Sequence, residues 1–154
     1  MPKFTLALSE NKMRYLTLGY RLIVLSPLLS FLLLVIVGMQ TEMTALTLTA
    51  SIIGVQICGM ALYLIGYSKP SEPSENPPHL LLGGVFLVIW GALIAWYITS
   101  WHDFHIRYYL PEKPLTFLDE VNYAAYVLKG LLWVFAGLML IITSISKKFR
   151  VYQT

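Results

Sequence analysis

The stretch LLLGGVFLVIWGALIAWYITS, residues 80–100, decides the fold of this chain, because it runs for a membrane thickness without a charged residue. A helix of about 20 apolar residues crosses the hydrocarbon core of a bilayer. Apolar side chains do not alternate here with polar ones, as they do in a transmembrane β-strand. Since a segment in lipid must satisfy its own backbone hydrogen bonds, we expect residues 80–100 to form a transmembrane α-helix.

The composition of the whole chain also indicates that lipid surrounds the protein. Of its 154 residues, 57% are hydrophobic and only 12% are charged, against about 25% charged residues in a soluble domain. A soluble fold this short could not bury so much apolar surface, so the lipid bilayer is the first expected partner. The net charge of +3 comes without a Lys/Arg-rich patch interleaved with aromatic residues, and we therefore expect no nucleic-acid partner.

Three further apolar runs are long enough, or nearly so, to cross the bilayer. The sequence therefore predicts an all-α, polytopic (multi-pass) membrane protein whose residues 1–154 form a single four-helix transmembrane domain, a four-helix bundle. The expected spans cover about residues 22–39, 45–67, 80–100 and 125–146.

The first span resembles the apolar core of a signal peptide, since basic residues precede it. It is longer than most such cores and no Ala-x-Ala cleavage site follows it, so we interpret it as a retained transmembrane helix. Pro27 is expected to kink this helix, because proline has no N–H to donate to the carbonyl one turn earlier. Ser26 and Ser30 are placed to satisfy the freed carbonyl groups.

The outer loop at residues 101–116 is rich in aromatic residues. The helical period of the third span continues into this loop, so we expect the third helix to project beyond the bilayer until Pro111 ends it. A Thr116-x-x-Asp119 pattern resembles a capping box with Asp in place of Glu. The fourth helix is therefore expected to begin near Phe117, well before the membrane core.

Lys and Arg residues predict the orientation. Residues 68–78 form a Pro/Ser-rich linker that divides the spans into two hairpins. Eight basic residues lie in the N-terminal segment, this linker and the C-terminal tail, whereas the two opposite loops carry only Arg107 and Lys113. Because cytoplasmic loops are enriched in Lys and Arg, we expect the linker and both the N- and C-termini to be cytoplasmic in the cell (inner or plasma) membrane.

Small residues recur at helical spacing in three of the four spans. Such residues allow transmembrane helices to approach each other closely, and more of them are present than one bundle needs for its own packing. The cysteine among them is the only one in the chain, which excludes an internal disulfide. The small residues are Ala50, Gly54 and Cys58 in the second span, Gly84, Gly91 and Ala95 in the third, and Gly130, Gly137 and Ser144 in the fourth.

His102, Asp103 and His105 form the one cluster with metal-ligand chemistry. Imidazoles and a carboxylate bind zinc or copper, but a catalytic site needs three ligands and a structural site four. We favour a second interpretation, an aromatic belt at the membrane interface with the histidines in contact with water. A partner on the outer side would then interact with Trp101, Arg107 and Tyr108.

Lys129 is the only ionisable residue well inside an apolar span. A charge costs about 2.5–3.5 kcal/mol at the bilayer centre, so we expect the side chain to snorkel towards the outer interface. The alternative is a pairing inside the protein or with a carboxylate of another subunit. Candidate partners on the same chain are Glu42, Asp119, Glu120, Asn122 and Tyr126.

Gln56 lies in the middle of the second span. We expect its amide to hold helices together through a hydrogen bond, which contributes about 0.6 kcal/mol on average in membrane proteins. The alternative is a polar path that Gln56 shares with Thr49 and Ser51, with Lys129 facing inward.

The sequence carries no nucleophile–base pair, no phosphate-binding glycine loop and no paired catalytic carboxylates. We therefore expect no catalytic residues and no cofactor. The leading hypothesis is a non-catalytic integral membrane subunit, or assembly protein, that packs against other membrane subunits or forms a homo-oligomer. Two alternatives remain open: a small transporter or channel near Gln56 and Lys129, and a metal- or haem-dependent membrane redox protein that uses His102 and His105.

Overall fold

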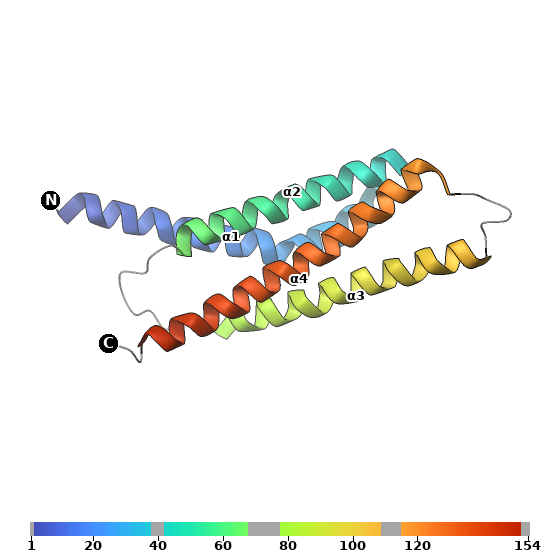
Figure 1. Cartoon of the computed structure of the whole chain (residues 1–154). Helices are drawn as coiled ribbons and strands as arrows, with labels where there is room; N and C mark the ends of the chain where they lie inside the picture. Colours follow the sequence, from blue (N-terminus) through green and yellow to red (C-terminus); the bar gives the residue numbers. More distant parts are fainter. Residues whose placement is uncertain (1, 38–41, 68–77, 109–114, 152–154) are drawn as a thin grey trace.

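The computed structural model of the chain is all-helical and contains four helices long and apolar enough to span a membrane (Figure 1). The prediction of an all-α, multi-pass membrane protein is confirmed at this level. The structure describes the backbone of residues 2–37, 42–67, 78–108 and 115–151, and the side chains of residues 14–33, 44–67, 79–107 and 115–145. The helices are α1 (Pro2–Val37), α2 (Glu42–Tyr67), α3 (Pro78–Tyr108) and α4 (Phe117–Val151).

The helices cover the expected spans, except for residues 38–39 of the first span, which lie outside the described residues, and they extend beyond several of them. The third helix continues past residue 100 to Tyr108, as its helical period indicates, and the fourth begins at Phe117 as the capping pattern predicts. α1 is the main difference, because it begins at Pro2 and not near residue 22. No helix-breaking residue separates the basic segment from the apolar one, and proline is compatible with the first turn of a helix.

Most of the Pro/Ser-rich linker and part of the outer loop lie outside the described residues. The residues concerned are 68–77 of the linker and 109–114 of the outer loop, which include Pro111 and Lys113.

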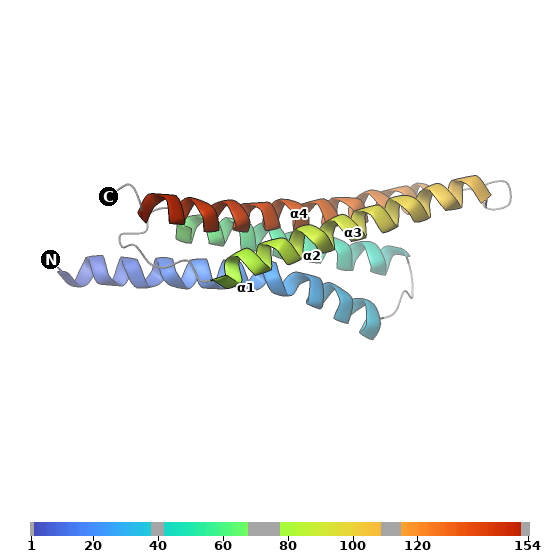
Figure 2. The same cartoon turned by 90° about the horizontal axis from the view of Figure 1, so that it is seen from below.

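The four helices alternate in direction, so that the first turns of α1 and the last turns of α4 lie at the same end of the molecule (Figures 1 and 2). α1 packs along α2, α3 packs along α4, and α2 also contacts α4. In Figure 2 the second half of α1 leans away from α4.

Glycines set the close approach of α3 and α4. A Cβ atom added to Gly91 would lie 2.5 Å from the carbonyl oxygen of Gly130, and one added to Gly84 would lie 2.8 Å from that of Gly137. Backbone therefore meets backbone at two places seven residues apart. The small residues of the third and fourth spans pack as the sequence predicts.

The stripe of small residues on α2 does not lie in a helix contact of this kind. Ala50, Gly54 and Cys58 are all exposed, and a Cβ atom added to Gly54 would meet nothing within 4 Å. α2 packs against α1 through another face, where a Cβ atom on Gly59 would lie 3.1 Å from side-chain atoms of Ile23. No described part of this chain covers the stripe.

Candidate functional site

The candidate site is a cluster of buried polar side chains between α1, α2 and α4. It begins next to Pro27 of α1. Pro27 has no N–H, so the carbonyl of Ile23 has no donor in the helix. The hydroxyl of Ser26 donates to that carbonyl at 2.8 Å, and the indole Nε1 of Trp133 donates to Ser26 Oγ, also at 2.8 Å. Ser26 is buried. The predicted role of Ser26 is confirmed, and the same oxygen also joins α1 to α4.

Lys129 lies on the inward face of α4, one turn before Trp133. Its side chain is only 3% exposed, and Nζ donates a hydrogen bond to Ser30 Oγ at 3.2 Å. The ammonium also lies 4.3 Å from the ring centroid of Tyr126 and 5.6 Å from that of Trp133. The expected snorkelling is therefore wrong, because a hydroxyl and two aromatic faces solvate the charge inside the protein.

The described carboxylates that were expected to pair with Lys129 interact with other residues. Asp119 caps α4 and Glu120 pairs with His102, while the side chain of Glu42 lies outside the described residues. Among the described side chains, no carboxylate forms an ion pair with Lys129. Tyr126 contacts the ammonium through its ring, and its hydroxyl is buried without a hydrogen bond from a described residue.

Gln56 meets the same turn of α4. Its side chain is fully buried, and Nε2 donates to the backbone carbonyl of Lys129 at 3.4 Å. The interaction joins α2 to α4, as predicted for a packing amide. The other amide atom, Oε1, is buried without a hydrogen bond from a described residue. Three helices thus converge on one level of the interior, through Ser30, Gln56 and Lys129.

A small cavity adjoins Lys129 on its α1 and α2 side. It has room for about one water molecule. It is lined by Ser30, Leu33, Leu48, Thr49, Ile52 and Lys129, and the atoms that face the space are apolar. Thr49 is 2% exposed.

Ser51 does not lie with the other residues of the predicted polar path. Ser51 is exposed on the face of α2 that points away from the other helices, called here the outer face of α2. Its hydroxyl donates to the carbonyl of Thr47 at 2.9 Å. Towards the other end of the molecule, Ala136 and Leu140 are fully buried on the inward face of α4. They separate the Lys129 level from a second polar contact, between the hydroxyls of Tyr63 and Thr143 at 2.8 Å.

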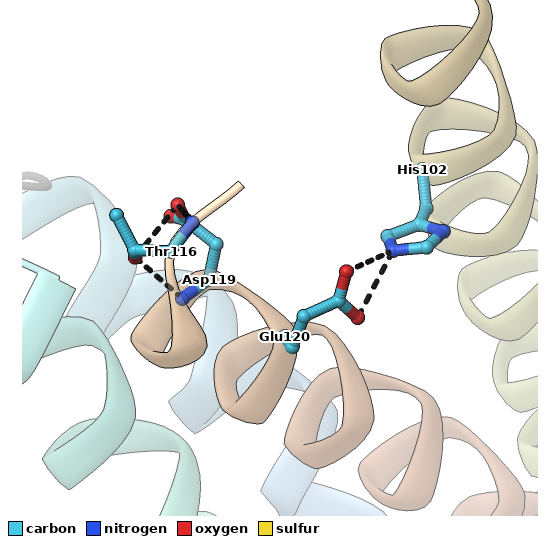
Figure 3. Close-up of polar contacts among 4 residues, drawn as sticks. All are labelled: His102, Thr116, Asp119 and Glu120. Atoms are coloured by element: carbon cyan, nitrogen blue, oxygen red, sulfur yellow. Dashed lines mark hydrogen bonds and ion pairs between the residues drawn. The ribbon is translucent and has the colours of Figure 1, made fainter. Parts of the chain in front are cut away.

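The start of α4 has the predicted capping box (Figure 3). The backbone N–H and hydroxyl of Thr116 both donate to Asp119 Oδ2 at 2.8 Å, and the N–H of Asp119 donates to Thr116 Oγ1 at 3.2 Å. The shorter Asp side chain therefore replaces Glu in this reciprocal pattern.

The histidine cluster is divided between different partners. His102 Nε2 lies 3.3 Å from both carboxylate oxygens of Glu120, which points across from α4 (Figure 3), and its ring stacks on Tyr123 with centroids 3.8 Å apart. The ring of His105 packs against Trp101 at 5.2 Å. Asp103 is exposed.

No group of three His, Cys, Asp or Glu side chains among the described residues could hold a metal ion. Asp103 therefore does not complete a ligand set with His102 and His105, and the redox hypothesis gains no support from this geometry. Trp101 and Arg107 are exposed at the same end, and the side chain of Tyr108 lies outside the described residues.

Sequence reasoning missed Trp133 as a member of the polar cluster. Two signals point to it. Trp133 lies one helical turn from Lys129 and therefore on the same face, and the serines on either side of Pro27 mark a turn of α1 with spare hydrogen-bonding groups.

Comparisons of the chain with models of protein families, with characterised proteins and with solved structures find no match.

Proposed function

We propose that the protein is a non-catalytic membrane subunit that associates with a second copy of itself through the outer face of α2. One observation carries the proposal. Of the nine glycines that the structure describes, eight have a neighbouring atom at 3.1 Å or less from an added Cβ, whereas Gly54 has none within 4 Å. A glycine inside a helix costs about 1 kcal/mol relative to alanine, and packing among the described residues gives no reason for Gly54.

The outer face of α2 has the properties of a helix contact in lipid. Ala50, Gly54 and Cys58 form a continuous stripe of small exposed residues, which allows a second helix to approach the backbone. The stripe carries no charge that would repel a copy of itself.

A second copy is the occupant that matches this stripe. Two copies inserted in the same orientation have parallel α2 helices, and a two-fold axis along the membrane normal then places one stripe against the other. Such a contact is self-complementary, with Gly54 of one copy facing Gly54 of the next. A contact of this kind needs no further partner protein.

The native cysteine tests the proposal. Cys58 lies exposed on the stripe and is the only cysteine, so oxidation in membranes at low protein density should link two chains into a species of twice the 17.5 kDa monomer mass. Gly54→Leu should strongly reduce this cross-linking without changing the fold, because the added side chain has open space within the chain.

A matched control moves the cysteine to another exposed face. In a Cys58→Ala background, Leu93→Cys lies on α3 at a position 53% exposed and should cross-link far more slowly. Equal rates for Cys58 and for the relocated cysteine would indicate random collision and would contradict the proposal.

The proposal includes the orientation of the chain in the membrane. The excess of Lys and Arg in the N-terminal segment, the linker and the tail supports two hairpins with cytoplasmic termini in the cell membrane. Phe117, 84% exposed at the start of α4, then lies outside. In a Cys58→Ala background, Phe117→Cys should react with a membrane-impermeant thiol reagent in intact cells; reaction only after permeabilisation would reverse the orientation.

A small transporter or channel is a second candidate, because Lys129 faces the interior and Gln56 bonds to the same turn. The position of Ser51 opposes the path predicted for it. Reaction of Thr49→Cys, in a Cys58→Ala background, with water-soluble thiol reagents would favour transport. A position sealed from water would leave the subunit hypothesis.

A further inference from the structure

One exposed face of α1 is basic at one end and apolar at the other. Residues 14, 18, 21, 25, 28 and 32 follow each other in alternating steps of four and three, which places them on one side of a helix. All six side chains are exposed, and Leu28 at 64% is the most exposed of its leucines. This α1 stripe consists of Arg14, Leu18, Arg21, Leu25, Leu28 and Leu32.

The two arginines of the α1 stripe lie on either side of the lipid headgroup layer. The apolar run of α1 begins at Leu22, so Arg21 lies at the boundary of the hydrocarbon. At 1.5 Å per residue, Arg14 lies about 10 Å further from the hydrocarbon. The headgroup layer of one leaflet is about 5–8 Å thick, and long arginine side chains extend into it from both of its boundaries. A phosphate in this layer is therefore within reach of both guanidinium groups.

The charge at this end of the molecule favours an anion. Among the described side chains, no carboxylate forms an ion pair with Arg14 or Arg21. Residues 1–21 contain four basic residues and one acidic residue. The last turns of α4, which lie at the same end (Figure 1), add three more basic residues.

The exposed arginine at the opposite end of the molecule has acidic neighbours. Arg107 lies in the last turn of α3, and the exposed Asp103 precedes it by four residues, which is the spacing of an ion pair on a helix. Asp119 and Glu120 begin α4 at the same end. An anionic headgroup is therefore attracted to Arg14 and Arg21 more strongly than to Arg107.

A phospholipid matches both parts of the α1 stripe. Guanidinium groups bind phosphate through paired, charge-assisted hydrogen bonds. Leu25, Leu28 and Leu32 continue for about 10 Å into the hydrocarbon, where they lie beside an acyl chain. The headgroup follows from charge, because the ammonium of a zwitterionic lipid repels the arginines and competes for the phosphate, whereas an anionic headgroup carries no cation.

We propose that the α1 stripe binds one anionic phospholipid. Arg14 and Arg21 hold its phosphate, and Leu25, Leu28 and Leu32 contact one of its acyl chains. The site lies on α1 within one copy of the chain, so it does not depend on the association through the outer face of α2.

Native mass spectrometry of the purified protein tests the site. The protein is released from mixed micelles that contain equal amounts of phosphatidylglycerol and phosphatidylcholine with the same acyl chains. The wild type should retain phosphatidylglycerol in preference by at least about tenfold at low salt, since each basic residue near a headgroup contributes about fivefold. A photoreactive group on the acyl chain of phosphatidylglycerol should cross-link mainly to residues 25–32 of α1.

Variants separate this site from a general effect of charge. Arg21→Gln should reduce the preference about fivefold, and Arg14→Gln combined with Arg21→Gln should abolish it. Arg107→Gln is the matched control, because it removes an exposed arginine at the opposite end, and should leave the preference unchanged. All three changes replace exposed side chains and should keep the helix content, which circular dichroism measures.

Three outcomes overturn the proposal. The first is a wild-type protein that retains the two lipids equally, and the second is a double variant that keeps the wild-type preference. The third is a pattern of cross-links spread evenly over the four helices, which would indicate an ordinary shell of lipid without a site on α1.

Discussion

The proline turn of α1 provides a quantitative test of how this chain holds its helices together. Ser26→Ala removes two hydrogen bonds at once, the one from Ser26 to the carbonyl of Ile23 and the one from Trp133 to Ser26, both at 2.8 Å. Hydrogen bonds inside membrane proteins contribute about 0.6 kcal/mol on average and up to about 1.7 kcal/mol. We therefore expect Ser26→Ala to lower the free energy of unfolding by about 1–3 kcal/mol.

The change at the neighbouring residue isolates the role of the proline. In Pro27→Ala, the new backbone N–H can donate to the carbonyl of Ile23, as in an ordinary helix. Ser26 then retains only its bond with Trp133. The destabilisation caused by Ser26→Ala should therefore fall to about half when it is introduced into the Pro27→Ala background, which is a coupling that a double-mutant cycle measures.

The assay is reversible unfolding in mixed micelles with increasing sodium dodecyl sulfate, followed by tryptophan fluorescence. Ser51→Ala serves as the control, since its exposed hydroxyl bonds only within α2, and should change the stability by less than about 0.5 kcal/mol. If Ser26→Ala destabilises the Pro27→Ala protein as much as it does the wild type, Ser26 does not replace the missing donor and the account of this turn is refuted.

Three further changes test other contacts in the same unfolding assay. Gly91→Leu places a side chain against the carbonyl of Gly130, 2.5 Å from the ideal Cβ position, and should cost at least about 1–3 kcal/mol; wild-type stability would contradict the close α3–α4 contact. Asp119→Ala removes the acceptor of Thr116 and should cost about 0.5–2 kcal/mol, with a matching loss of helix by circular dichroism. Trp133→Phe keeps the ring but removes the donor to Ser26 and should cost about 0.6–1.7 kcal/mol; an unchanged stability would show that the indole bond is not needed.

The elements of this fold are predictable from local signals. A run of apolar residues of membrane length predicts a helix because lipid offers the backbone no other donors or acceptors, and Thr116 with Asp119 predicts the start of α4 because the capping contacts lie within one turn. The role of Ser26 is predictable for the same reason, since Pro27 and Ile23 are its neighbours in the same helix.

The direction of Lys129 is not predictable in this way. Whether a lysine snorkels or turns inward depends on what the other helices offer it, and its partner Ser30 lies 99 residues away in the sequence. The stripe on α2 shows the same limit. The spacing of Ala50, Gly54 and Cys58 marks a face for close packing, but only the arrangement of the helices shows that this face points away from the rest of the chain.

The most direct test of the proposed association is a distance between copies. Spin labels on Leu64→Cys in a Cys58→Ala background lie on α2 beside the stripe, at a position 49% exposed. In liposomes with a large excess of lipid they should give an intermolecular distance within about 30 Å by pulsed electron paramagnetic resonance, because axes of packed helices lie 8–10 Å apart. The same label in Gly54→Leu should lose most of this signal. A sample with the native Gly54 and without this distance, or a distance that Gly54→Leu leaves unchanged, would contradict the association of two copies through the outer face of α2.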